Sequence, residues 1–196
     1  MTHYYDAKQT SKFIPKEIKW ILRGKEFAFT TGSGMFSIDR IDKGTETLID
    51  YCEVPSEAKV LDLGCGYGAI GIAIKKCLPK TEVTMTDINE RAVSLAKKNA
   101  ERNRVGVKVS SGDLYEPIGE EKFDVILVNP PYVAGREFCY KIIEESIKHL
   151  NPKGSLQLVA RHNKGGAMLE KKMLEVFENV NTLAKKAGYR VYESKN

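Results

Sequence analysis

Asn129, Pro130, Pro131 and Tyr132 follow an apolar run at residues 123–128 and carry groups suited to chemistry on an amine. Proline fixes φ and lacks the N–H that a central strand must donate, so two in succession end the strand and leave a stiff loop. In open α/β sheets, ligands bind outside the carboxyl ends of the strands. We therefore expect this amide and this phenol to face a ligand.

The chemistry that this loop favours is methyl transfer to an exocyclic amine. Such an amine is a poor nucleophile because its lone pair is delocalised into a base ring or an amide. If the Asn129 side-chain oxygen and the Pro130 carbonyl each accept one N–H, the lone pair is turned toward the methyl donor. Tyr132 would stack on the planar target, an interaction worth about 1–3 kcal/mol for a nucleobase. A plain proline-rich turn is the alternative.

A glycine-rich segment at residues 60–71 predicts a strand, a turn and a helix start. Glycine accepts positive φ and lets a ligand approach the backbone closely. A dinucleotide site would show G-x-G-x-x-G, whereas here Asp62 precedes Gly64, Gly66 and Gly68, which are spaced by two. The carboxylate disfavours a diphosphate and suits the cationic methionine amine of S-adenosylmethionine. The alternative is a turn that only packs helix on strand.

Two further carboxylates follow the next two expected strands. Asp87 ends the first, where an acid can accept both hydroxyls of a ribose, although helix capping explains it equally well. Asp113 follows the second and could accept an adenine amino group beside the Leu114 backbone amide, although an isolated turn aspartate is common. With Asp62, these carboxylates would form one rim of one crevice.

From residue 58 onward, short apolar runs alternate with amphipathic stretches, which is typical of βαβ units and a parallel sheet. Strands are expected at residues 60–63, 83–87, 105–110, 123–129, 156–160, 180–183 and 189–192. Helices are expected at residues 70–77, 92–100, 139–150 and 168–177. The last two strands predict a hairpin about Ala187-Gly188, which implies a reversed strand at the sheet edge.

Residues 1–196 are expected to form a single domain in which residues 1–44 extend a catalytic core at 45–196. Residues 27–30 and 35–38 flank Thr31-Gly32-Ser33-Gly34, which predicts a small β-hairpin. Thr45 is expected to cap a helix that runs to about Cys52.

The composition favours a soluble, cytoplasmic protein with an anionic partner. The 196 residues are 42% hydrophobic, which suffices for a full core, and the net charge of +5 favours a nucleic acid. The sequence has no apolar run long enough for a signal peptide or a membrane span, so we expect neither. The cysteines show no CxxC spacing, so we expect free thiols and no metal; they are Cys52, Cys65, Cys77 and Cys139.

Taken in order, these motifs resemble the class I S-adenosylmethionine-dependent methyltransferases that modify amines. His3-Tyr4-Tyr5, Gly34-Met35-Phe36-Ser37 and the segment 41–45 are similar to the ribosomal RNA small subunit methyltransferase C family and its small archaeal relatives. The resemblance implies an α/β, Rossmann-like fold whose seven-stranded, mostly parallel sheet has one reversed strand and helices on both faces. It also implies methyl transfer to N2 of a guanine in ribosomal RNA.

The resemblance carries site residues with it. The expected cofactor-binding set is Asp62, Gly64, Cys65, Gly66, Gly68, Asp87, Ile88, Asp113, Leu114, Asn129 and Thr45. The expected substrate-binding set, on an RNA-facing rim, is Phe36, Arg136, Arg161 and Lys164. His162 has no acid partner in the sequence pattern, so we interpret it as a loop residue or an RNA contact.

Two departures from that family bear on the substrate. Bacterial members carry a degenerate second domain before the catalytic one, and this chain has room for the catalytic half alone; they also usually carry Phe where Tyr132 stands. Adenine N6, cytosine N4 and a protein glutamine stay open as acceptors, as does a non-catalytic RNA-binding module. The sequence leaves the oligomeric state open.

Overall fold

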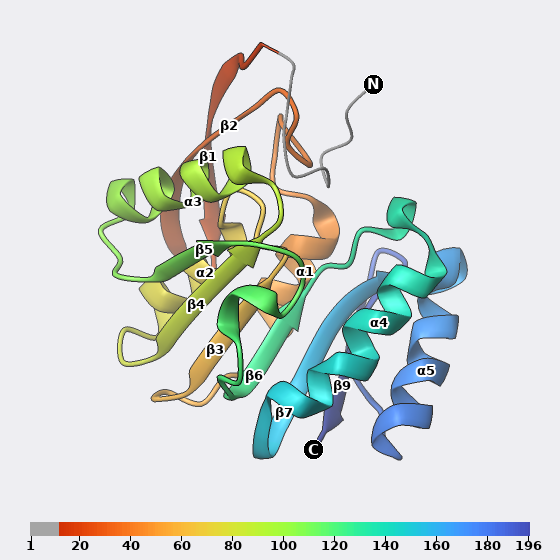
Figure 1. Ribbon diagram of the computed structural model, residues 1–196. Helices are drawn as coiled ribbons and strands as arrows, with labels where there is room; N and C mark the ends of the chain where they lie inside the picture. The colour runs from red at the N-terminus through yellow and green to blue at the C-terminus, as the bar shows by residue number, and fades with distance from the viewer. Residues whose placement is uncertain (1–11) are drawn as a thin grey trace.

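The computed structural model describes residues 12–196, so the expected His3-Tyr4-Tyr5 motif lies outside the described residues. The main sheet is built from β3 (Lys59–Leu63), β4 (Glu82–Asp87), β5 (Lys108–Ser111), β6 (Phe123–Val128), β7 (Leu150–Arg161), β8 (Asn181–Lys186) and β9 (Tyr189–Lys195). Their spatial order is β5-β4-β3-β6-β7-β9-β8 (Figure 1). The pairings from β5 through β7 are parallel, as expected.

The reversed strand does not lie at the sheet edge, so that expectation was wrong. β9 pairs antiparallel with β7 on one side and with β8 on the other, and β8 forms the edge. β9 is buried on both faces of the sheet, with Val191 in one core and Tyr192 in the other, as is typical of an inner strand, whereas β8 ends in exposed Lys185 and Lys186. Charged residues on an edge strand also discourage pairing with another chain. The hairpin that joins the two strands is confirmed.

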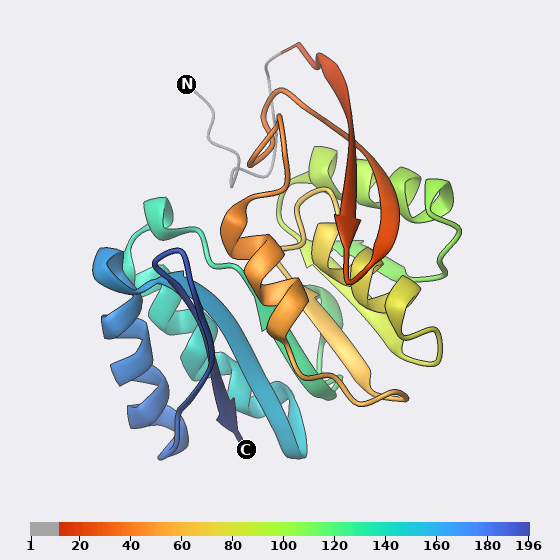
Figure 2. The same cartoon turned by 180° about the vertical axis from the view of Figure 1, so that it is seen from behind.

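Helices cover both faces of the sheet. One face carries α1 (Lys43–Tyr51), α2 (Ala69–Cys77) and α3 (Glu90–Arg102), and the other carries α4 (Arg136–Ser146) and α5 (Ala167–Phe177). α4 crosses the face seen in Figure 1, and α1 and α2 cover the face seen in Figure 2. The expected helices are confirmed, although α4 ends at Ser146 and a short 3-10 turn covers 147–149.

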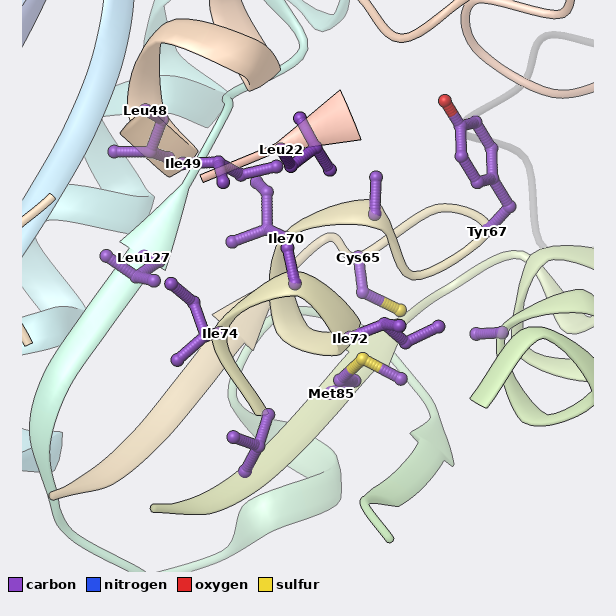
Figure 3. Packing of buried hydrophobic residues seen from close by; sticks show 14 of the residues in the cluster. Leu22, Leu48, Ile49, Cys65, Tyr67, Ile70, Ile72, Ile74, Met85 and Leu127 are labelled. Carbon is purple, nitrogen blue, oxygen red and sulfur yellow. The ribbon is translucent and has the colours of Figure 1, made fainter. Parts of the chain in front are cut away.

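Alternate residues of the central strands supply the two cores. Val60 packs in the core beneath α1, α2 and α3, while Leu61 and Leu63 pack in the core beneath α4 and α5. This alternation follows from the strand period of two. Figure 3 shows Ile70 of α2 directed toward Ile49 of α1, and Ile74 of α2 beside Leu127 of β6.

The N-terminal hairpin differs from the expected one. β1 (Pro15–Leu22) and β2 (Lys25–Gly32) pair antiparallel across a two-residue turn, Arg23-Gly24, with φ of 46° and 73°. Two positive φ values are typical of the type I′ turn that suits a hairpin. The segment 35–38, expected to be the second strand, forms bends instead.

Two buried asparagines, Asn99 within α3 and Asn103 at its C-cap, explain why residues 35–38 do not pair with β2. Asn99 accepts from the Thr30 N–H at 2.7 Å and donates to the Thr30 carbonyl at 2.9 Å. Asn103 makes the same pair of bonds with Ala28, at 3.2 and 2.8 Å. With β1 along its other side, β2 has no backbone groups left for a third strand at these positions.

In the described part of the chain, no helix combines the length and the apolar character that crossing a bilayer requires.

The four cysteines are free thiols, as expected. Burial raises the pKa of Cys52 to about 12 and that of Cys139 to about 11. Cys52 and Cys139 are therefore protonated, poorly reactive core residues at neutral pH.

Candidate active site

A cleft of about 610 Å³ lies over the carboxyl ends of β3, β4 and β6. Most of the predicted site residues line it: Phe36, Thr45, Gly64, Cys65, Gly66, Asp87, Ile88, Asp113, Leu114, Asn129, Pro130, Pro131, Tyr132, Arg161 and Lys164. Asp62, Gly68 and Arg136 are not among its lining residues. Its volume is in the range usual for small-molecule and cofactor sites.

The glycine turn after β3 presents open backbone to the cleft. Gly64 and Gly66 have φ of 71° and 56°, and a Cβ at either position would meet no atom within 4 Å. The N–H groups of Gly64 and Cys65 both donate to the Thr86 carbonyl at 2.9 Å, and that of Gly66 donates to Asp87. These three amides are therefore used within the protein, which supports the argument against a bound diphosphate.

The third glycine of the motif serves packing. A Cβ at Gly68 would lie 2.8 Å from Ile72 Cδ1 and 3.3 Å from the Ala96 Cβ. The next glycine, Gly71, is tighter still, because a Cβ there would approach the Met85 sulfur to 2.4 Å. The lack of a side chain at Gly68 and Gly71 therefore lets this part of the chain pack closely against Ala96 of α3 and Met85 of β4.

Asp62 ties β3 to α2 from a buried position. Its Oδ2 accepts from the Gly71 N–H at 2.8 Å, and its Oδ1 has no partner among the described residues. Burial, reinforced by the nearby Asp87, raises the pKa of Asp62 to about 7. The structure thus gives Asp62 a structural contact, and does not bring it to the cleft wall where we expected it to meet a cofactor amine.

Asp87 lines the cleft at the end of β4 and is held from two sides. Its Oδ2 accepts from Gly66 N–H and its Oδ1 from Asn89 N–H, both at 2.8 Å. Asn89, as expected, caps α3 by accepting from Arg91 and Ala92 N–H. Capping is therefore the role of Asn89, and the fixed Asp87 carboxylate is free to accept further donors in the cleft. Burial raises its pKa.

Asp113 lies on the more open side of the cleft. Its side chain is 48% exposed, and one oxygen is 4.0 Å from Lys141 Nζ. The adjoining Leu114 has a φ of 44°, so the chain turns sharply there. Asp113 and Ile88 thus contribute to the same opening from different strand ends.

Asn129 is held by the first turn of α1. Its Nδ2 donates to Thr45 Oγ1 at 2.9 Å and to Asp42 Oδ2 at 3.2 Å. Both hydrogens of the amide therefore have acceptors within the protein. No hydrogen bond among the described residues occupies the Asn129 side-chain oxygen, so it can accept from a ligand.

Asp42, and not Thr45, caps α1. Asp42 Oδ2 accepts from the N–H groups of Gly44 and Thr45 at 2.8 and 3.1 Å. Aspartate and threonine are both strong caps, and the pattern Asp-x-x-Thr allowed either choice. Asp42 and Tyr189 are cleft residues that the sequence interpretation missed. The burial of Tyr189 and its closeness to Asp42 raise the pKa of its hydroxyl.

Tyr132 lies partly buried between the cleft and the core. Its ring is close to Gly165, where a Cβ would come within 3.1 Å of the ring. Its hydroxyl is buried without a hydrogen-bond partner among residues 12–196, and burial raises its pKa. Among the described residues, the hydroxyl makes no hydrogen bond that a phenylalanine would lose.

The basic side chains near the cleft differ in their surroundings. Arg161 lies over the Tyr189 ring at 5.6 Å, and Lys164 lines the cleft from the turn at 162–166. Arg136 instead lies over the Tyr140 ring on α4 and pairs with Glu137 at 3.2 Å. Arg161 and Lys164 are therefore the cations placed at the cleft.

His162 has partners that the sequence pattern did not reveal. Its Nδ1 is 2.7 Å from the Tyr192 hydroxyl and 3.9 Å from Glu170 Oε2. The residue is not among those lining the cleft. The inference that it has no acid partner was wrong, because Glu170 reaches it from α5.

A comparison with known families decides the class of the protein. The family model described as methyltransferase small domain matches residues 26–193. The chain belongs to this family.

Named relatives and solved structures agree with this assignment. The chain is 38% identical over 196 residues to the uncharacterized protein YbxB of Bacillus subtilis, and the match covers 98% of each chain. It is 38% identical over 169 residues to ribosomal RNA small subunit methyltransferase C of Haemophilus influenzae strain PittEE, covering 83% of this chain. This chain spans about half the length of that relative, 49%.

The fold is shared with a solved methyltransferase. The structure of the T. thermophilus 16S rRNA N2 methyltransferase RsmC, in complex with AdoMet and guanosine, superposes with a TM-score of 0.82. The two are 24% identical, and the match covers 96% of this chain and 52% of that one. The predicted class I fold is confirmed, and the family makes the chain a methyltransferase.

Proposed function

We propose that this methyltransferase transfers a methyl group to N2 of a guanine in ribosomal RNA. The observation that carries the proposal is the Asn129 amide, whose nitrogen is held by Thr45 and Asp42 so that its oxygen is left for an amine. Two of the three proteins compared above are ribosomal RNA methyltransferases by name, and the solved one is an N2 methyltransferase in complex with guanosine, which supports guanine as the acceptor.

The cleft residues fit the cofactor. Asp87 would accept the ribose hydroxyls, because its carboxylate is fixed and lines the cleft. Asp113 and the Leu114 amide would meet the adenine, and Thr45 would lie at the methionine end. Gly64 and Gly66 leave the space that a close ligand needs. When bound, S-adenosylmethionine supplies an electrophilic methyl group on a sulfonium.

The protein's part in the reaction is orientation. Asn129 Oδ1 and the Pro130 carbonyl would each accept one N–H of the guanine amine, which turns its lone pair toward the methyl group. Tyr132 would hold the base plane, and the nitrogen would lose its extra proton to water after transfer. Positioning of this kind can supply roughly 7–11 kcal/mol of barrier reduction.

Charge favours RNA as the larger partner. The chain carries a net +5, and Arg161 and Lys164 lie at the cleft, where they would meet phosphates. Affinity should therefore fall as salt rises, because bound counterions are released. A paired guanine must leave its stack to reach the cleft, which favours a loop or an assembly intermediate as the substrate.

The test is a competition between acceptor pools. The wild-type protein receives labelled S-adenosylmethionine together with ribosomal RNA, single-stranded DNA and a glutamine-containing protein extract. We expect label in RNA alone. Label confined to DNA or to protein would overturn the proposed substrate while leaving the enzyme class intact.

A further inference from the structure

The first turn of α1 does more than begin a helix. Thr45 Oγ1 and Asp42 Oδ2 accept the two hydrogens of Asn129 Nδ2, at 2.9 and 3.2 Å. All three residues line the cleft, and the two acceptors lie three residues apart at the helix start. The reactive amide therefore has a dedicated support from a distant segment.

Only one orientation of the Asn129 amide satisfies this support. A half-turn of the amide would exchange its oxygen and its NH2 group. The Asp42 carboxylate can only accept, so the turned amide would place its oxygen against a negatively charged acceptor. The pair thus selects the orientation in which the Asn129 oxygen points away from α1.

Asp42 is itself fixed in place. It accepts from the N–H groups of Gly44 and Thr45 as the cap of α1. A negative charge is favoured at a helix N-terminus, where the backbone N–H groups are unpaired. The support is therefore rigid before any ligand binds.

We propose that Asp42 and Thr45 are positioning residues that orient and polarise the Asn129 amide for the acceptor amine. The inference rests on the proposed function. As the N–C bond forms, the C–S bond breaks and its electron pair goes to sulfur, so positive charge develops on the nitrogen. An amide that donates to a carboxylate becomes a stronger acceptor at its oxygen, since hydrogen bonds in a chain reinforce one another.

The test uses variants that keep the helix. Thr45→Val removes one acceptor and keeps the shape, and Asp42→Ser keeps a cap but has no carboxylate to reach Asn129. Thr47→Val is the matched control, because its Oγ1 donates to the Lys43 carbonyl at 2.6 Å within the same helix. kcat is measured at saturating cofactor and RNA, and the cofactor Kd is measured by calorimetry.

Each of the two site variants should lower kcat at least tenfold, and Thr45→Ser should restore it. Thr47→Val should match the wild type. The double variant should lose the slow hydrogen exchange of the Asn129 side-chain NH2 group, followed by nitrogen-15 NMR without any substrate. A double variant that keeps kcat within twofold of the wild type, while Asn129→Ala is inactive, would overturn the support role.

Two other results would separate a wrong proposed function from a wrong support geometry. If Asn129→Ala kept its kcat, the proposed function of the loop would be wrong, and the support role would fall with it. If the wild-type Asn129 NH2 group exchanged as fast as a free amide, the support geometry itself would be wrong, whatever the substrate.

Discussion

The Gly66 backbone N–H donates to Asp87 Oδ2 at 2.8 Å and joins the glycine turn after β3 to the end of β4. A single carboxylate thereby shapes the turn and faces the cleft. Since hydrogen bonds to a charged group contribute about 1.5–3 kcal/mol each, we expect Asp87→Asn to raise the cofactor Kd roughly 10- to 100-fold. Calorimetry measures this. Asp50→Asn, which changes a carboxylate outside the cleft lining, is the control, and an equal Kd in the two variants would contradict the assignment.

Replacing Asn129 by Ala should remove turnover and spare cofactor binding. The loss of one preorganised hydrogen-bonding group at the reacting atom typically lowers kcat by about 10²–10³. Asn129→Asp should be equally inactive, because a carboxylate there would face Asp42 at 3.2 Å with the same charge. Steady-state methylation at saturating RNA and cofactor gives kcat. Turnover that survives in both variants would exclude the amide from the reaction.

Tyr132→Phe should keep its activity, whereas Tyr132→Ala should not. The hydroxyl is buried without a partner, so its removal breaks no hydrogen bond in the described structure. The ring is what would stack on a base, and its loss should raise the KM for RNA by about 10-fold or more at ~1–3 kcal/mol per stacked base. A KM series over the three proteins tests this. A large loss in Tyr132→Phe would assign the hydroxyl a role in binding or chemistry.

Because of the raised pKa of Asp62, we expect the free energy of unfolding to fall as the pH rises toward neutrality. Its pKa is raised from 3.8 to about 7, so between these values the unfolded chain releases a proton that the folded protein retains. The stabilisation is fully present below the pKa that Asp62 has in the unfolded chain, and it is lost as the pH rises through the pKa that Asp62 has in the folded protein. The free energy of unfolding should fall by at most ~4 kcal/mol over this range, at 1.36 kcal/mol per pKa unit. Asp62→Asn should lack this slope. Urea unfolding from pH 4.5 to 7.5 measures it, and a constant difference between the proteins would contradict the ionisation.

The sequence predicts the sheet and the cleft well because both follow from local patterns. The strand ends at Asp87 and Val128 are marked by residues that follow within a few positions, the helix cap Asn89 and the two prolines Pro130 and Pro131. The N-terminal hairpin could not be placed in the same way. Its outer edge is occupied by the side chains of Asn99 and Asn103, from a helix about 70 residues later in the chain.

In the site, too, the features that depend on neighbouring residues could be predicted from the sequence, and the contacts between distant segments could not. The Asn129 amide was expected at the cleft from its own neighbours in sequence. Its support by Asp42 and Thr45 joins segments that only the folded sheet brings together. Likewise, Asp62 reads as a cleft residue in the motif, yet strand alternation turns its side chain toward Gly71 under α2.

Nucleoside mass spectrometry tests the central claim most directly. The wild-type protein is incubated with ribosomal RNA and S-adenosylmethionine that carries a CD3 group, and the RNA is then digested to nucleosides. We predict N2-methylguanosine that contains three deuterium atoms, absent when Asn129→Ala replaces the wild type. Deuterated methyl in N6-methyladenosine or N4-methylcytidine, with none in N2-methylguanosine, would contradict the account.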